Sequence, residues 1–230
     1  MIQNRIVRGV LLDVDGTLID SNDAHAHAWL EAMGENGYKD VPFEKVRPLI
    51  GMGGDKVLPE VIGVDKDSDD GKKISQSRKE IFKTRYIPTL HAFPYTLDLL
   101  KRMHGQGLKL IIATSAEPDE LDAVLQLIDP HASELFADQS SSEDAKVSKP
   151  DSDVVQVAIK KADLSPQELV MLGDTAYDIE AADKADVKTI AFRSGGWKDE
   201  DLKGAVAIYN DPADLLARYN ESPLVKGLSQ

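Results

Sequence analysis

The chain has 230 residues, of which 42% are hydrophobic and 29% charged, and its formal net charge is −13. This length suits one sizeable core with a modest second domain, and the acidic balance argues against a nucleic-acid or anionic-membrane surface, which needs clustered lysine and arginine. The absence of cysteine excludes disulfides, thiolate metal sites and cysteine nucleophiles. The N-terminal apolar run is too short for a signal peptide or a membrane span, so we expect a cytoplasmic protein.

Short apolar and β-branched runs alternate with amphipathic helical stretches along most of the chain. These runs predict strands at 6–12, 108–113, 135–137, 168–172, 187–192 and 205–209. Helical faces lie between them, for example at Leu121, Val124 and Leu125. Such alternation predicts an α/β fold, specifically a Rossmann-like, doubly wound parallel sheet.

One interval breaks this alternation. About seventy residues separate the first predicted strand from the helix before the second, far more than a simple crossover needs. Within the interval, one helical face is formed by Ala28, Trp29, Ala32 and Met33. We therefore expect an α/β core domain of residues 1–19 and 88–230, and an inserted α-helical domain of residues 20–87 over the C-terminal end of the first strand.

Polar side chains follow three of the predicted strands. Asp13 and Asp15 end the first strand, Thr114 follows the second, and Asp174 follows the fourth. If the sheet has the strand order 3-2-1-4-5-6, the carboxyl ends of these strands share a crevice of the kind in which such sheets bind ligands. Lys149, at the start of a predicted helix, also belongs to the set that we expect there.

This set of residues supports phosphoryl transfer. The carboxylates of Asp13, Asp15 and Asp174 are the oxygen ligands that Mg²⁺ prefers. Lys149 and the metal would stabilise charge on the transferring oxygens, while Thr114 would hold the same oxygens by a hydrogen bond. We expect Ser115 and the backbone N–H groups of the Asp-Gly-Thr turn, at Gly16 and Thr17, to assist Thr114 in binding phosphate. Asp15 can protonate the leaving alcohol and later deprotonate the water that hydrolyses an aspartyl-phosphate.

The four motifs DVDGT, the strand ending in Thr114, Lys149-Pro150 and GDTAYD resemble those of the haloacid dehalogenase (HAD) superfamily. The resemblance covers essentially the whole chain and is to the phosphatase branch with a small helical cap, which includes phosphoglycolate phosphatases and β-phosphoglucomutases. It implies that Asp13 is the nucleophile and Asp15 the general acid and base. It further implies that Thr114 and Lys149 bind phosphate.

The resemblance also implies a metal site. Mg²⁺ would be bound by Asp13, Asp174 and the backbone carbonyl of Asp15. Asp178 matches a second acidic position that supports the metal or the lysine.

Each residue also has a structural interpretation. Asp13 and Asp15 could cap the following segment, Thr114 and Ser115 fit a helix N-cap, and Asp178 suits the first turn of a helix. Lys146 competes with Lys149 for the lysine role, and Pro150 at a helix start favours Lys149.

The helical insertion offers further candidates. We expect His25, near its start, to face substrate. Gly51, Gly53 and Gly54 form a loop that could touch substrate, although they lack the lysine of a P-loop.

We expect an enzyme that hydrolyses a phosphate monoester of a small metabolite with Mg²⁺ and an aspartyl-phosphate intermediate. The alternative is a β-phosphoglucomutase-like phosphomutase, which His25 favours but Gly54, at the place of that branch's arginine, disfavours. Asp15 argues against a dehalogenase, and the chain length argues against a phospho-acceptor receiver domain; a metal-binding scaffold without turnover is a further alternative. The sequence does not identify the ester, nor decide between monomer and homodimer, and it predicts no nucleic-acid or membrane partner.

Overall fold

The computed structural model describes residues 5–141 and 147–228. Six parallel strands form one sheet in the order β3-β2-β1-β4-β5-β6. In chain order they are β1 (Gly9–Leu12), β2 (Lys109–Ala113), β3 (Asp138–Ser140), β4 (Leu169–Gly173), β5 (Lys188–Phe192) and β6 (Ala207–Tyr209). The predicted strand order and the α/β doubly wound fold are confirmed.

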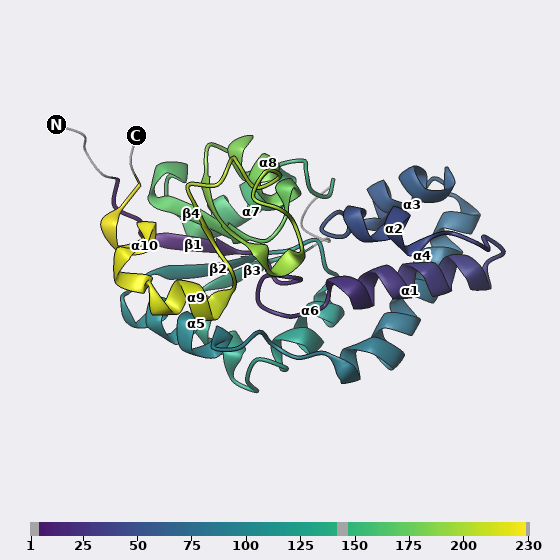
Figure 1. Cartoon of the computed structure of the whole chain (residues 1–230), viewed down its shortest axis with the longest axis horizontal. Coiled ribbons are helices and arrows are strands. Elements are labelled where there is room, and N and C mark those ends of the chain that lie inside the picture. The colour runs from purple at the N-terminus through teal and green to yellow at the C-terminus, as the bar shows by residue number, and fades with distance from the viewer. Residues whose placement is uncertain (1–4, 142–146, 229–230) are drawn as a thin grey trace.

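Helices cover both faces of this sheet (Figure 1). The described residues form the helices α1 (Asn22–Glu35), α2 (Phe43–Val46), α3 (Gly54–Ile62), α4 (Asp69–Ile81), α5 (Thr96–Gly105), α6 (Pro118–Leu125), α7 (Asp153–Ala162), α8 (Ala176–Asp183), α9 (Pro212–Ala217) and α10 (Pro223–Lys226). Successive side chains of a strand point to opposite faces, so Val10 and Leu12 of β1 join the cluster that includes α5, α6 and α9. Leu11, between them, joins the cluster that includes α7 and α8. Burial on both faces explains why the central strands are continuously apolar.

The third strand differs from the prediction. We expected it at 135–137, but residues Ala132–Leu135 form a 3₁₀ turn and β3 begins at Asp138. Pairing with β2 starts at Ala137, whose N–H donates to the carbonyl of Leu110 over 2.8 Å. Because β3 is an edge strand with two exposed polar residues, the apolar run marks the packed segment before it rather than the strand itself.

The helical segment between β1 and α5 lies beyond the carboxyl ends of the strands (Figure 1). Its α1 buries the predicted face of Ala28, Trp29, Ala32 and Met33. The two segments that connect it to the core lie side by side. The N–H of Asp20 donates to the carbonyl of His91 over 3.0 Å, and the N–H of Phe93 donates to the carbonyl of Leu18 over 3.0 Å. The polypeptide therefore enters and leaves this segment through one pair of neighbouring connections. We call residues 20–87 the helical insertion.

The two ends of the described chain also lie together (Figure 1). Arg5 and Leu228 form an antiparallel bridge, with N–H···O distances of 3.1 and 2.9 Å. No helix of the described residues has both the length and the apolar character needed to cross a membrane.

Candidate active site

Asp13, Thr114 and Asp174 directly follow three neighbouring strands. Leu12 of β1 pairs with Ile112 of β2 on one side and with Leu172 of β4 on the other. Parallel strands end at the same edge of a sheet, so the structure brings the three polar side chains together there, and all three are buried.

A group of three carboxylates and one ammonium forms the centre of this region. One oxygen from each of Asp13, Asp174 and Asp178 lies within 4.8 Å of the others. The Nζ of Lys149 lies 2.5 Å from Oδ1 of Asp13 and 2.7 Å from Oδ1 of Asp178, and its side chain is only 1% exposed. The group therefore places three carboxylates against one ammonium in a largely buried space.

Burial and mutual repulsion shift the titration of this group. Burial raises the pKa of Asp13 to about 7, and Asp178 and Asp15 add to that rise while Lys149 opposes it. Burial also raises the pKa of Asp174 well above its usual value, and the neighbouring carboxylates of Asp13 and Asp178 raise it further. A divalent cation would relieve this repulsion and keep the acids ionised, so this all-oxygen donor set fits Mg²⁺.

Asp174 is held by neighbours that leave little free space around it. Oδ1 accepts a hydrogen bond from the hydroxyl of Thr17 over 2.8 Å, and Oδ2 accepts one from the amide of Asn22 over 2.9 Å. Two glycines approach the same carboxylate: a Cβ on Gly16 or Gly195 would lie 2.3 or 1.9 Å from Oδ2. Gly16 also has a φ of +77°, so both its conformation and its surroundings require the absence of a side chain.

Asp178 uses its two oxygens for different purposes. Oδ2 accepts hydrogen bonds from the N–H of Thr175 over 3.0 Å and from its hydroxyl over 2.7 Å, as part of a capping box at the start of α8. Oδ1 faces Lys149. Asp178 therefore orients the lysine as well as capping the helix.

Asp15 lies outside the group of three carboxylates. Its Oδ1 accepts a hydrogen bond from the hydroxyl of Ser21 over 2.6 Å and lies 2.8 Å from Nε2 of His25, whose ring stacks on Phe82. Burial raises the pKa of Asp15, but His25, Ser21 and Arg78 together outweigh that effect and lower it to about 2. The arrangement thus separates two carboxylates: Asp13, which is buried in an acidic group, and Asp15, which is partly buried among hydrogen-bond donors.

The remaining predicted residues lie close to this centre. Thr17 also donates to Oδ2 of Asp13 over 3.2 Å. Thr114 is 1% exposed, and its Oγ1 accepts a hydrogen bond from the N–H of Ala116 over 3.1 Å. The hydroxyl of Ser115 is buried and has no hydrogen-bond partner among the described residues. Lys146, the competing lysine, lies outside the described residues.

A cavity of about 440 Å³ lies between the helical insertion and the core, and Asp13 and Asp15 are among the residues that line it. Gly51, Gly53 and Gly54 of the predicted loop also line it. The N–H of Gly53 donates to the hydroxyl of Ser148 over 3.0 Å, which fixes this loop against the core. A Cβ on Gly54 would lie 2.9 Å from the ring of Trp29, so this position has no room for a side chain without movement of the indole.

Two residues of the cavity wall were not predicted from the sequence. Arg78 of α4 donates from one nitrogen to both carboxylate oxygens of Glu120 in α6, over 2.7 and 2.8 Å. They are 42 residues apart, and α4 is charged along most of its length, so no local pattern distinguishes Arg78. The available signal was a Glu beside the apolar face of α6, where it is buried.

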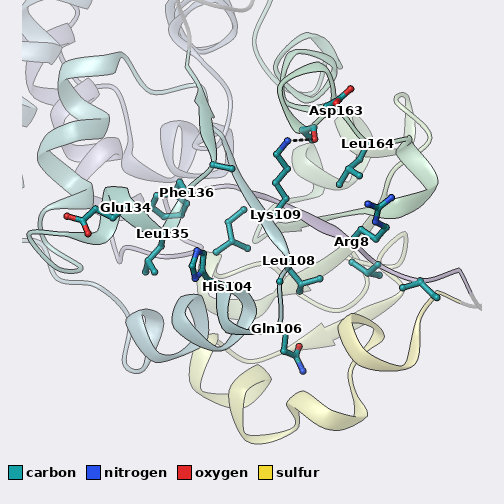
Figure 2. Close-up of a pocket in the computed structure, with 16 residues that line it drawn as sticks. Arg8, His104, Gln106, Leu108, Lys109, Glu134, Leu135, Phe136, Asp163 and Leu164 are labelled. Carbon is teal, nitrogen blue, oxygen red and sulfur yellow. Dashed lines mark hydrogen bonds between the residues drawn. The ribbon is translucent and has the colours of Figure 1, made fainter.

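A larger cavity, of about 770 Å³, lies at the opposite, amino-terminal ends of β1 and β2 (Figure 2). Its cations already have partners: Arg8 pairs with Glu168 at 2.7 Å, and Nζ of Lys109 donates to the carbonyl of Ala162 over 2.7 Å. In Figure 2, Glu134 points away from Lys109, and no group of acids gathers among the labelled residues. The chemistry expected for this chain therefore belongs to the smaller cavity.

Known proteins of the same fold match nearly the whole chain. A phosphoglycolate phosphatase from Aliivibrio fischeri is 28% identical over 196 residues, which cover 82% of this chain and 85% of that protein. A pyrophosphatase PpaX from Bacillus cereus is 24% identical over 185 residues, which cover 80% and 82%. The crystal structure of a hydrolase from Pseudomonas syringae superposes with a TM-score of 0.84 at 27% identity, over 93% of this chain and 98% of that one.

A family model agrees with these likenesses. The model described as haloacid dehalogenase-like hydrolase matches residues 10–192, from the strand that precedes Asp13 to the end of β5. The match spans the three strand ends that carry the site, together with the helical insertion. The chain belongs to the haloacid dehalogenase-like hydrolase family, as the sequence motifs predicted.

Proposed function

We propose that this chain is a Mg²⁺-dependent phosphatase that hydrolyses a small phosphate monoester through an aspartyl-phosphate on Asp13. The observation that carries the proposal is the pairing of two carboxylates, one buried and one partly buried, with different surroundings. Asp13 pairs with Lys149 and lies beside the carboxylates of Asp174 and Asp178. Asp15 lines the same cavity and lies against Ser21 and His25. A nucleophile and a separate proton-transfer group are what a two-step hydrolysis needs.

Asp13 and Asp174, with the backbone carbonyl of Asp15, would hold the metal. Bound there, Mg²⁺ would neutralise negative charge on the phosphoryl oxygens and so let a carboxylate approach them. Lys149 is oriented by Asp178 toward Asp13, which places its charge where the transferred oxygens would lie.

In the first step an oxygen of Asp13 attacks phosphorus, and the bond from phosphorus to the leaving oxygen breaks. A proton that the monoester carries as its monoanion passes by way of Asp15 to that oxygen, so an alcohol leaves. In the second step Asp15 takes a proton from water, the water oxygen attacks phosphorus, and the bond between Asp13 and phosphorus breaks. Inorganic phosphate is released, Asp15 gives the proton to solvent, and both aspartates return to their ionised forms.

The surroundings of Asp15 favour its role in the second step. With a pKa of about 2 it is ionised at neutral pH, which is the form that accepts a proton from water. His25 belongs to α1, and its Nε2 lies 2.8 Å from Oδ1 of Asp15. We therefore propose that His25 orients Asp15 when the helical insertion, acting as a cap domain, covers the site, instead of binding phosphate itself.

Two comparisons support hydrolysis. The relatives named above are called a phosphoglycolate phosphatase and a pyrophosphatase, and both names describe the release of phosphate from a small molecule. Phosphomutase activity is disfavoured because Gly54 packs on Trp29, so the arginine expected of a mutase has no space there.

Steady-state hydrolysis of a generic phosphate monoester tests the proposal. We expect turnover that requires Mg²⁺ and is lost in Asp13→Asn, with Lys149→Ala strongly impaired. Undiminished turnover in Asp13→Asn would contradict the mechanism, and loss of turnover in Lys146→Ala but not in Lys149→Ala would overturn the assignment of the lysine. Release of many phosphates per chain separates an enzyme from a phospho-acceptor protein.

A further inference from the structure

Arg78 and Glu120 form an ion pair in the wall of the cavity that holds Asp13 and Asp15. The pair joins α4 of the helical insertion to α6 of the core. The side chain of Glu120 is 2% exposed and that of Arg78 is 14% exposed. Both oxygens of Glu120 accept from the same guanidinium nitrogen, over 2.7 and 2.8 Å.

Both terminal nitrogens of the Arg78 guanidinium have partners inside the protein. Its second terminal nitrogen lies 2.5 Å from Nδ1 of His25, and the group lies 4.9 and 5.5 Å from the ring centroids of Phe82 and Trp29. An anionic ligand that replaced Glu120 as the ion-pair partner of Arg78 would leave Glu120 as a buried carboxylate without a partner, which is strongly unfavourable. An anion placed beside the intact pair would instead meet the charge of Glu120.

The rest of the wall offers little positive charge. Among the described residues that line the cavity, Lys66 and Arg78 are the lysine and arginine side chains, and Lys66 is exposed. Beyond the two catalytic aspartates, the lining carboxylates are Asp55, Asp65, Asp67, Glu117 and Glu120. Charge in this part of the cavity therefore disfavours a second anion.

The same wall offers uncharged hydrogen-bonding groups. The hydroxyls of Ser75 and Ser115 are buried, and neither has a hydrogen-bond partner among the described residues. Buried polar atoms are almost always satisfied by protein, water or ligand. These two hydroxyls are suited to the hydroxyl groups of a bound molecule.

We infer that the substrate's leaving group is uncharged and bears hydroxyls, and that the Arg78–Glu120 pair selects against esters that carry a second anionic group. This inference rests on the proposed phosphatase function and names the substrate class of that site. It places 2-phosphoglycolate, whose leaving group ends in a carboxylate, among the poor ligands of this chain.

Binding to the Asp13→Asn protein tests the inference without turnover. The two probes are 2-hydroxyethyl phosphate and 2-phosphoglycolate, which have the same carbon skeleton and differ in a hydroxyl against a carboxylate. Titration calorimetry with Mg²⁺ present should give about tenfold tighter binding of 2-hydroxyethyl phosphate, the size of effect expected for one unfavourable charge contact.

Three further substitutions, each added to the Asp13→Asn protein, test whether Glu120 causes the preference for 2-hydroxyethyl phosphate. Glu120→Gln removes the carboxylate and frees Arg78, so the preference should vanish or reverse, whereas Glu120→Asp keeps the charge and should keep the preference. Asp119→Asn is the matched control, because it removes the same charge from the same helix at a side chain that is 45% exposed and outside the cavity lining. That variant should leave the ratio of affinities unchanged.

Equal or tighter binding of 2-phosphoglycolate to the Asp13→Asn protein would overturn the inference, and so would equal effects of Glu120→Gln and Asp119→Asn. If Glu120→Gln fails to fold, the ratio in the Asp13→Asn protein still decides. Turnover of 2-hydroxyethyl phosphate by the unaltered chain is measured separately. A tenfold affinity ratio without any turnover would support the selectivity and contradict only the proposed function.

Discussion

Replacing Lys149 by Met should lower the stability of the protein as well as its activity. The side chain is 1% exposed and lies 2.5 and 2.7 Å from the carboxylates of Asp13 and Asp178, so its removal leaves two buried acids without their cation. Removing one partner of a buried ion pair costs about 3–5 kcal/mol. Asp13, with a pKa of about 7, can limit this loss by taking up a proton, so we expect about 3 kcal/mol, at the lower end. For a chain of this size that is a fall in Tm of about 6–12 °C.

The pH dependence has a definite sign. An acid whose pKa is raised on folding stabilises the native state at low pH, and that contribution is lost as pH rises through the folded-state pKa. Without Lys149 the raised pKa of Asp13 rises further, so the loss of stability should be larger at about pH 8 than at about pH 6.

Urea unfolding in the presence of a chelator measures both effects. Lys184→Met is the matched control: this lysine is 42% exposed and pairs with Glu180 at 2.9 Å, so its removal should cost at most about 1 kcal/mol. Equal stabilities for Lys149→Met and Lys184→Met would refute the reasoning, and so would a loss for Lys149→Met that does not grow with pH.

Three other predictions concern the site. Gly195→Ala places a methyl carbon 1.9 Å from Oδ2 of Asp174, so the Mg²⁺ concentration for half-maximal activity should rise at least about tenfold. The control is Gly105→Ala, where no atom lies within 4 Å of the added methyl group, and it should leave that Mg²⁺ concentration unchanged. Thr17→Val removes the hydroxyl hydrogen bonds to Asp13 and Asp174 and should weaken Mg²⁺ binding by about 10–100-fold, measured by the same titration. An unchanged midpoint would show that the hydroxyl does not orient the carboxylates. Chelation should abolish hydrolysis and added Mg²⁺ restore it, with a higher thermal midpoint in Mg²⁺ than in chelator; full activity in chelator would contradict the metal requirement.

The sequence predicted the part of the fold that burial determines. The central strands are covered on both faces, so their apolar runs are continuous and mark β1, β2, β4 and β5 within a few residues. The strand order then brought Asp13, Thr114 and Asp174 to one edge. The edge strand β3 is exposed and polar, so the same signal gave a position three residues too early.

The sequence could not predict contacts between distant helices. Arg78 and Glu120 meet only because α4 of the helical insertion lies against α6 of the core, and helical periodicity does not determine how two helices pack. Likewise, His25 was expected to face substrate, but its position against Asp15 depends on the stacking of its ring on Phe82, 57 residues later in the chain. Spacing along the chain found the residues that the sheet positions, and from the helical insertion it named His25 and the glycine loop but not Arg78.

The central claim is that a covalent bond forms between phosphorus and a carboxylate oxygen of Asp13. The Asp15→Asn variant tests this claim most directly. This variant keeps the nucleophile but lacks the carboxylate that activates water in the second step. Incubation with Mg²⁺ and an aryl phosphate, whose phenolate can leave without a proton from Asp15, should therefore leave phosphorylated protein. Mass spectrometry after acid quench should find one phosphoryl group, on the peptide that contains Asp13, and none in the Asp13→Asn, Asp15→Asn double variant. A phosphoryl group on another residue, or one that persists in the double variant, would contradict the account.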